Sequence, residues 1–313
     1  MSPYEIVTQL AVYIRDAVRP HLGTLQSRGL AGIAASGDTT FAIDEVAEDA
    51  IVSFIERNRL SVAYYSEDKG LIEFGDEPAG VLIIDPIDGT RPAMAGFEQC
   101  VVSVAWADYK PDAAMRDVRY GCIAELKQDD ILVAERGGGA TWRRADGSTC
   151  PARLLPIKTI DRAPLSFEFA ARPASLISTV LGDIVDAASL NGGVFVVNST
   201  AYSLTRLVTG QLAASIDVGP RIYADLPRCR PAFDKLGGGR MIGLFSYDIA
   251  AAALIAREAG AIVTDAYGRP HDDMRLLDTS PGNVTSMCAA STPALHAALL
   301  AEIEAGMARL GGG

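Results

Sequence analysis

The chain has 313 residues, of which 49% are hydrophobic and 21% charged, and its formal net charge is −11 at pH 7. This length allows one large or two medium domains with a full core, and the composition is that of a soluble α/β protein. The negative charge argues against nucleic acid or an anionic membrane as the main partner. An anionic substrate would therefore need bound cations.

The cysteines and the apolar segments indicate the compartment. Five cysteines are scattered without a Cys-x-x-Cys pair, which favours reduced thiols and argues against a zinc site. The amino terminus has no basic region followed by a long apolar run, so we expect no export signal. The most apolar stretch, 241–263, contains Asp248, Arg257 and Glu258, and is expected to form a core helix and strand. We therefore predict a cytoplasmic protein with no membrane partner.

Hydrophobic periodicity predicts the elements of the first half of the chain. The expected helices cover 4–18 and 44–57, and the expected strands cover 61–65, 81–84, 100–107, 118–126 and 131–135. The last three strands predict an antiparallel sheet, and a polar hinge over 69–79 is expected before the central strand 81–84. In the second helix we expect the acidic residues Glu45, Glu48 and Asp49 to face solvent.

The second half of the chain alternates between strands and helices. The expected strands cover 165–169, 194–197, 212–216 and 261–264, and the expected helices cover 173–189, 200–209, 247–259 and a C-terminal segment from about 293. This alternation predicts a layered α/β domain. Three prolines loosen the composition over 145–165, so we predict an α+β domain over 1–155 and an α/β domain over 156–313.

Residues 81–90 carry the first candidate site. Four apolar residues precede Asp85, and Pro86 is expected to end the strand pairing. Asp88 follows three residues after Asp85, and Gly89 lets backbone amides approach a ligand, an arrangement that suits a hard metal ion and a phosphate. An ordinary Asp-Gly turn at the end of a strand is the alternative.

Other acids stand where predicted strands or helices begin or end. Glu67 follows the strand 61–65, Asp44 begins the second helix, and Asp248 lies in the first turn of an alanine-rich helix. The helix dipole favours an anion in a first turn, and simple helix capping is the alternative for Asp248.

Three ordered motifs resemble those of the inositol monophosphatase superfamily of metal-dependent, lithium-sensitive phosphatases. The motifs are Ser66-Glu-Asp, Asp85-Pro-Ile-Asp-Gly-Thr90, and Tyr247-Asp-Ile-Ala-Ala with Glu258-Ala-Gly. The resemblance covers about residues 5–300, and the segment 35–48 is most similar to the archaeal-type branch. Members of that branch often hydrolyse both fructose 1,6-bisphosphate and inositol monophosphate. The resemblance implies a layered α-β-α-β-α sandwich and a homodimer.

The resemblance also implies a set of metal ligands. One Mg²⁺ would be held by Glu67, Asp85 and the carbonyl of Ile87, and a second by Asp85, Asp88 and Asp248. A third ion near Glu67 and replacement by Mn²⁺ are further expectations. Magnesium prefers oxygen ligands, and two such ions about 3.5–4 Å apart can activate a water for attack on phosphorus.

The catalytic and substrate-binding residues follow from the same resemblance. Thr90 with Asp44 would orient and deprotonate the attacking water, with Glu67 in the catalytic set. The amides of Gly89 and Thr90 would receive the phosphate. The remaining substrate contacts would come from Asp88, Asn198, Ser199, Thr200, Asp217 and Asp248, where Asp217 takes the family's acidic ring-binding position.

Two features depart from the family pattern. The segment 218–246 is an insertion that carries Arg221, Arg228, Arg230, Lys235 and Arg240. This segment can hold a second phosphate, or it can be a surface loop. Arg91-Pro92 also stands where inositol monophosphatases commonly have Thr-Asn-Phe.

We therefore expect a magnesium-dependent phosphomonoesterase that acts on a small phosphorylated metabolite, a sugar or inositol phosphate. The alternatives are a 3′-phosphoadenosine 5′-phosphate phosphatase, a histidinol-phosphate phosphatase, and a non-catalytic relative that binds metal or phosphate. A haloacid-dehalogenase site is excluded because its two acids are two residues apart. An EF-hand that begins at Asp85 would need Glu where Gly96 stands.

Overall fold

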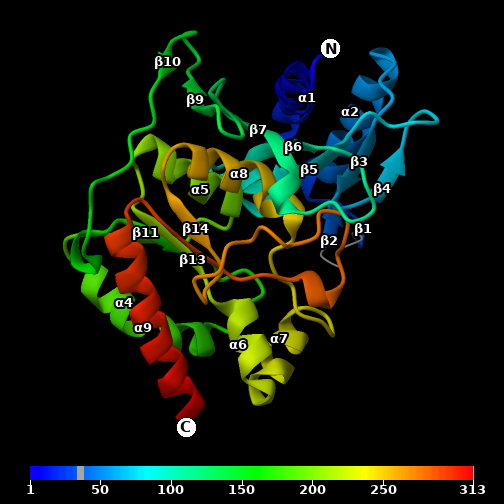
Figure 1. The fold of residues 1–313 in the computed structure, drawn as a ribbon. Helices are drawn as coiled ribbons and strands as arrows, with labels where there is room; N and C mark the ends of the chain where they lie inside the picture. The colour runs from blue at the N-terminus through cyan, green and yellow to red at the C-terminus, as the bar shows by residue number, and fades with distance from the viewer. Residues whose placement is uncertain (34–38, 313) are drawn as a thin grey trace.

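The computed structural model describes residues 1–33 and 39–312 as helices packed on two main sheets (Figure 1). The large sheet has eight strands in the order β10-β9-β8-β7-β6-β5-β3-β4, and the small sheet has five in the order β12-β11-β13-β15-β14. A third sheet pairs β1 with β2. Residues 35–38 of the archaeal-type segment lie outside the described residues.

Except for the end of β5, the strands that the sequence predicted agree with the observed bounds to within a few residues, whereas β1, β2, β4, β9, β10 and β15 were not predicted. The strands are β1 Leu30–Ile33, β2 Thr39–Phe41, β3 Ala63–Ser66, β4 Gly70–Glu73, β5 Val81–Asp88, β6 Val101–Ala107, β7 Val118–Glu125, β8 Ile131–Glu135, β9 Gly139–Arg143, β10 Thr149–Cys150, β11 Leu165–Phe167, β12 Val194–Phe195, β13 Ala214–Asp217, β14 Ile262–Thr264 and β15 Met287–Ala290. The α-helices are α1 Pro3–Val18, α2 Ala42–Arg57, α3 Thr90–Ala95, α4 Ala174–Ala188, α5 Thr200–Thr209, α6 Gly219–Asp225, α7 Arg230–Leu236, α8 Ser246–Glu258 and α9 Pro293–Gly312.

The central strands of the large sheet are buried on both faces, which explains the continuous apolar run of β5. In β5, Leu82 and Ile84 pack in the same core cluster as α1 and α2, whereas Val81 and Ile83 pack in the cluster that contains α8. Successive side chains of a strand point to opposite faces, so a strand covered on both sides needs apolar residues at every position.

Helices α5 and α8 lie between the two sheets and complete a five-layer arrangement. Their apolar residues share one core cluster with the large sheet and with β14 and β15. Helices α4 and α9 cover the other face of the small sheet and form the outer layer opposite to α1 and α2 (Figure 1). The predicted α-β-α-β-α sandwich is confirmed. Helices α5 and α8, from the second half of the chain, pack on the large sheet of the first half. The domain boundary predicted at 155/156 therefore stays a prediction.

The predicted end of the central strand is wrong. Strand β5 continues to Asp88, where it pairs with Val101, and the register shifts between Asp85 and Asp88. Three steps along β5 oppose two steps along β6, which is a bulge that contains Pro86. The bulge lets the strand tolerate a proline, since the missing N–H falls where the ladder is already interrupted.

Two predicted irregular segments contain regular structure. The polar hinge over 69–79 includes β4, an exposed edge strand that pairs antiparallel with β3. The segment 218–246 folds into α6 and α7, which begin with prolines in their first turns. Proline at that position costs no helical hydrogen bond, so these prolines start helices that the sequence analysis treated as a break or a loop.

Within residues 1–33 and 39–312, none of the helices combines the length and the hydrophobicity needed to cross a membrane.

The contact between α4 and α9 depends on a glycine. A Cβ atom at Gly306 would lie 2.0 Å from the carbonyl oxygen of Val180, whereas one at Gly182 would meet nothing within 4 Å. We predict that Gly306→Ala destabilises the protein by about 1–3 kcal/mol, because it forces the helices apart. Gly182→Ala, also inside a helix, is expected to stabilise it by up to about 1 kcal/mol. Chemical denaturation measures both, and equal effects would contradict the close helix contact.

Candidate active site

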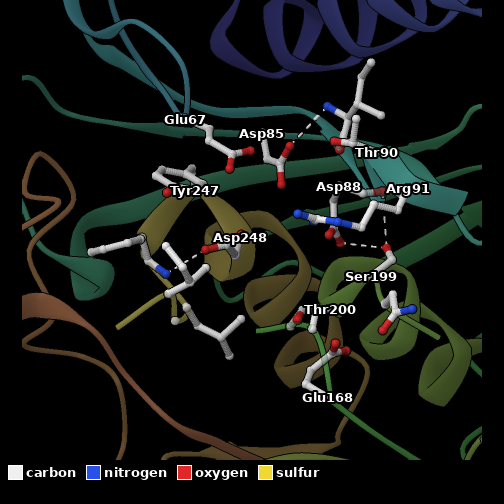
Figure 2. Close-up of a pocket in the computed structure, with 18 of the residues that line it drawn as sticks. Glu67, Asp85, Asp88, Thr90, Arg91, Glu168, Ser199, Thr200, Tyr247 and Asp248 are labelled. Atoms are coloured by element: carbon white, nitrogen blue, oxygen red, sulfur yellow. Dashed lines mark hydrogen bonds between the residues drawn. The ribbon is translucent and has the colours of Figure 1, made fainter. Parts of the chain in front are cut away.

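Most of the predicted site residues line one pocket, with a cavity volume of about 110 Å³. Figure 2 shows the carboxyl groups of four predicted metal ligands around one space in this pocket. The predicted residues that line it are Glu67, Asp85, Ile87, Asp88, Gly89, Thr90, Asn198, Ser199, Thr200 and Asp248. Segments far apart in the chain therefore meet here, as the sequence analysis expected, whereas Asp44 and Asp217 are not among the lining residues.

Asp85 is the most buried of the four predicted carboxylate ligands. It is 2% exposed, and its Oδ1 accepts a hydrogen bond from the amide of Ile87 at 3.1 Å. Burial, followed by the negative charges of Glu67, Asp88 and Asp248, raises the pKa of Asp85 well above its ordinary value. Its ionised form is therefore costly unless a cation balances the charge.

Asp88 is held by the start of α5. Its Oδ2 accepts a hydrogen bond from Ser199 Oγ at 2.8 Å and a second from the amide of Ala201. Burial raises the pKa of Asp88 to about 6, and these hydrogen bonds limit the rise. Ser199 also caps α5, since its Oγ accepts from the amide of Tyr202. Ser199 thus positions Asp88, in addition to lining the pocket.

Asp44 and Asp248 share one structural device. Each stands at the third position of its helix, and its Oδ2 accepts a hydrogen bond from the amide of a preceding phenylalanine, Phe41 at 2.8 Å or Phe245 at 2.6 Å. This contact is half of a capping box. Capping and a role in the site are therefore compatible, because the cap fixes the orientation of each carboxylate.

Thr90 connects the pocket to Asp44. Its Oγ1 lies 3.4 Å from Asp44 Oδ1 and 3.1 Å from the carbonyl oxygen of Ile87. A hydroxyl has one proton and can donate to one of these oxygens at a time. The arrangement allows a proton on Thr90 Oγ1 to move towards Asp44.

Gly89 makes the turn between β5 and α3 possible. Its φ is +91°, and a Cβ atom at this position would lie 2.4 Å from the carbonyl oxygen of Gln99. A side chain would be excluded both by the backbone conformation and by the neighbouring strand. The motif therefore requires glycine here.

The four carboxylates suit a hard cation, although they are not drawn together around one point. Among residues 1–33 and 39–312, no three His, Cys, Asp or Glu side chains are gathered closely enough to hold a metal ion as they stand. Hydrogen bonds hold Asp85, Asp88 and Asp248 on neighbouring backbone amides, and like charges favour this separation. The donors are all oxygens and the pocket concentrates negative charge, which are the properties that magnesium sites share.

Asp217, the predicted ring-binding acid, forms a buried ion pair instead of lining the pocket. Its Oδ1 accepts from Arg172 Nε at 3.3 Å and from the amide of Gly219 at 2.9 Å, and its Oδ2 pairs with the guanidinium group. Asp217 is 1% exposed and touches the site only through Arg172, which lines the pocket. A direct contact of Asp217 with substrate stays a prediction.

Three charged residues of the pocket were not among the predicted site residues: Arg91, which was noted only as a departure from the family pattern, and Glu168 and Arg172. Glu168 lies inside the predicted strand 165–169 and Arg172 follows it, so their place at the end of a predicted strand was the available signal. Neither belongs to a motif of the resemblance, and only the packing of the small sheet against α5 brings them to the site.

The arginines of the insertion bind other parts of the chain. Arg221 pairs with Glu304 of α9 and donates to the carbonyl of Ala266 at 2.8 Å, and Arg228 donates to a carbonyl near the end of α9. Arg230 donates to the carbonyl of Tyr223 at 2.9 Å. These contacts fasten α6 and α7 to α9. The insertion contributes 242–245 to the pocket wall, and those residues are uncharged.

Glu48 was expected to face solvent, and this expectation is wrong. It is 3% exposed, and it accepts hydrogen bonds from Ser66 Oγ at 2.5 Å and from the hydroxyl of Tyr64 at 3.4 Å. Helix α2 turns Glu48, one turn after Asp44, towards the end of β3 and not towards water. Burial raises the pKa of Glu48 from its ordinary 4.5 to about 7.

This burial predicts a pH-dependent effect of Glu48→Gln. A raised pKa means that the folded protein loses stability as pH rises from about 4.5 to about 7, when the buried group ionises. Glutamine can accept one hydrogen bond through its oxygen and donate the other from its NH2 group to a hydroxyl oxygen, without the charge. The Tm of the variant relative to wild type is therefore expected to rise between pH 5 and pH 8, measured in EDTA. Glu45→Gln, on the exposed side of α2, controls for the lost charge, and an equal gain in both variants would contradict the role of burial.

Comparison with known proteins gives consistent results. The model of the inositol monophosphatase family matches residues 4–308. The fructose-1,6-bisphosphatase/inositol-1-monophosphatase of Methanothermobacter thermautotrophicus is 26% identical over 305 residues, which are 96% of this chain and 95% of the relative. The Nus factor SuhB of Vibrio cholerae is 29% identical over 233 residues, 74% of each chain. The structure of the Thermotoga maritima IMPase is similar with a TM-score of 0.71 and 16% identity, covering 99% of this chain and 100% of that one.

Proposed function

Since the chain belongs to the inositol monophosphatase family, we propose that it hydrolyses a small sugar or inositol phosphate with magnesium bound at the pocket carboxylates. Relatives that are named as phosphatases support its place among the hydrolases. The observation that carries the proposal is Asp85, which is 2% exposed and surrounded by the charges of Glu67, Asp88 and Asp248. Such a group is costly in a protein that does not bind a cation there.

The residues that would hold the metal are Glu67, Asp85, Asp88, Asp248 and the carbonyl of Ile87. Two or three Mg²⁺ ions, or Mn²⁺ in their place, fit this all-oxygen set. When bound, such ions neutralise charge on the phosphate and lower the pKa of a bound water.

The remaining roles belong to the chain itself. Thr90 Oγ1, held between Ile87 and Asp44, would take a proton from the attacking water and pass it to Asp44. The amides of Gly89 and Thr90, exposed by the left-handed turn, would bind the phosphate. Glu67, which directly follows β3, lines the same pocket and would complete the catalytic set.

The alcohol part of the substrate would lie against Asn198, Ser199 and Thr200. Asn198 lines the pocket together with Ser199 and Thr200 at the start of α5. The name of the Methanothermobacter relative favours fructose 1,6-bisphosphate and inositol monophosphate over the two other phosphate esters considered. We also propose a homodimer, which the resemblance implies, and a reducing cytoplasm, which the free cysteines favour.

Asp85→Asn tests the proposal most directly. We expect phosphate release with magnesium to fall by about 100-fold or more, because the shared metal ligand is weakened. The metal-free variant is expected to have a higher Tm than wild type, because a buried charge is removed. Asp273→Asn, which changes an exposed acid, is the control and should retain activity. Near-normal turnover of Asp85→Asn would refute the metal assignment.

Lithium provides an independent test. We expect Li⁺ to inhibit magnesium-dependent phosphate release, because this small cation can occupy a magnesium position but carries only one positive charge instead of two. Inhibition should be measured at several magnesium concentrations in the same buffer with Na⁺ as the control salt. Equal inhibition of phosphate release by Li⁺ and Na⁺ would show that the protein is not specifically sensitive to lithium.

A further inference from the structure

The pocket contains a buried carboxyl oxygen that has no hydrogen-bond partner in the protein. Within residues 1–33 and 39–312, the buried side-chain oxygens without a partner are Glu168 Oε1 and Ser291 Oγ. Glu168 is 5% exposed and lines the pocket, whereas Ser291 is not among its lining residues. Unpaired buried polar atoms are costly and rare in proteins, so one that lines a pocket indicates a ligand.

The position of Glu168 in the fold supports this interpretation. It follows β11, which pairs in parallel with both β12 and β13, and its amide donates to the carbonyl of Ile216 at 3.1 Å. Ligands of α/β sheets commonly bind beyond the carboxyl ends of parallel strands. Figure 2 shows Glu168 across the pocket from Glu67 and Asp85, with its carboxyl group turned towards the pocket and towards Thr200.

The neighbouring arginine does not satisfy the unpaired oxygen. Arg172 donates from Nε and one terminal nitrogen to Asp217, and from the other terminal nitrogen to the carbonyl of Ala170 at 2.6 Å. These three bonds use three of the five N–H groups of Arg172, and none of them goes to Glu168. Of the two acids at this end of the site, Glu168 is the one that lines the pocket.

The surroundings of Glu168 also determine what it can bind. Burial raises the pKa of Glu168 to about 8; Arg172 opposes this rise, and the charges of Asp217 and Asp88 add to it. The carboxyl group is then mostly neutral at pH 7. A neutral carboxyl group both donates and accepts a hydrogen bond, as does an alcohol hydroxyl, and it offers no charge to an ammonium group.

We propose that Glu168 is a specificity-determining residue, whose carboxyl group hydrogen-bonds a hydroxyl on the alcohol part of the substrate, across the pocket from the phosphate. This inference rests on the proposed function, because it assumes that the four other carboxylates and their cations hold the phosphate. It assigns to Glu168 the contact that the sequence analysis expected from Asp217.

The test compares two phosphate esters in three variants. Myo-inositol 1-phosphate has hydroxyl groups on its alcohol part, and 4-nitrophenyl phosphate has none. For Glu168→Leu we expect kcat/KM for the inositol ester to fall by about 10-fold or more, mainly because KM rises. We expect kcat/KM for the nitrophenyl ester to change by less than about twofold. Glu168→Gln keeps a donor and an acceptor and should restore most of the loss. Ser291→Ala removes the other unpaired buried oxygen and is expected to leave both esters unchanged.

Three kinetic outcomes would overturn the inference. Glu168→Leu can lower kcat/KM equally for both esters, which indicates a general structural effect. It can also leave both unchanged, which indicates no contact. A third probe, 2-aminoethyl phosphate, tests a cationic group: if wild type prefers it to the inositol ester and Glu168→Gln removes that preference, the residue binds ammonium and not hydroxyl.

A binding measurement separates this inference from the proposed function. Absence of phosphate release from every ester refutes the proposed function alone. Calorimetric titration of the magnesium-loaded protein with myo-inositol 1-phosphate needs no turnover. Weaker binding by Glu168→Leu than by wild type and Ser291→Ala supports the inference, whereas equal binding, or no binding by wild type, overturns it.

Discussion

The accumulation of negative charge at one end of the large sheet is the constraint on which the site depends. Asp85 is almost fully buried, and the charges of three further acids act on it. Such a group of carboxylates is unfavourable in a folded protein, because each loses hydration and repels the others. The fold tolerates it by giving individual carboxylates backbone N–H donors. A divalent cation bound among them would remove the remaining repulsion, and such binding would then stabilise the folded protein.

Three local devices position these acids. The bulge in β5 brings Asp85 and Asp88 to the same pocket although they are three residues apart in one strand. Capping boxes fix Asp44 and Asp248 at the starts of α2 and α8. The left-handed Gly89 ends the strand and starts α3. Each of these features is formed by a few consecutive residues, so the spacing of residues within a motif largely determines the local geometry.

Other contacts hold the layers in register around the pocket. Glu48 fastens α2 to the residue that precedes Glu67, and Glu258 at the far end of α8 accepts hydrogen bonds from the amides of Gly137 and Gly139. The Glu-Ala-Gly part of the third motif thus contacts a turn of the large sheet, away from the pocket. Arginines of the insertion bind α9 in the same supporting manner. Charged residues of this chain therefore divide into a few that line the site and others that join its layers.

The sequence by itself predicted most of the longer strands and helices and the acids of the three motifs, because periodicity and motif spacing are local properties, and the resemblance of those motifs implied the layering. It did not determine Glu168, Arg172 or the buried pair that Arg172 forms with Asp217, since these residues become neighbours only when β11 and β13 pair. The burial of Glu48 was likewise undecided, because a helix position faces solvent or protein according to what packs on it. Burial also sets whether a carboxyl group is charged, so the tertiary structure decided the chemistry of acids that the sequence could only name.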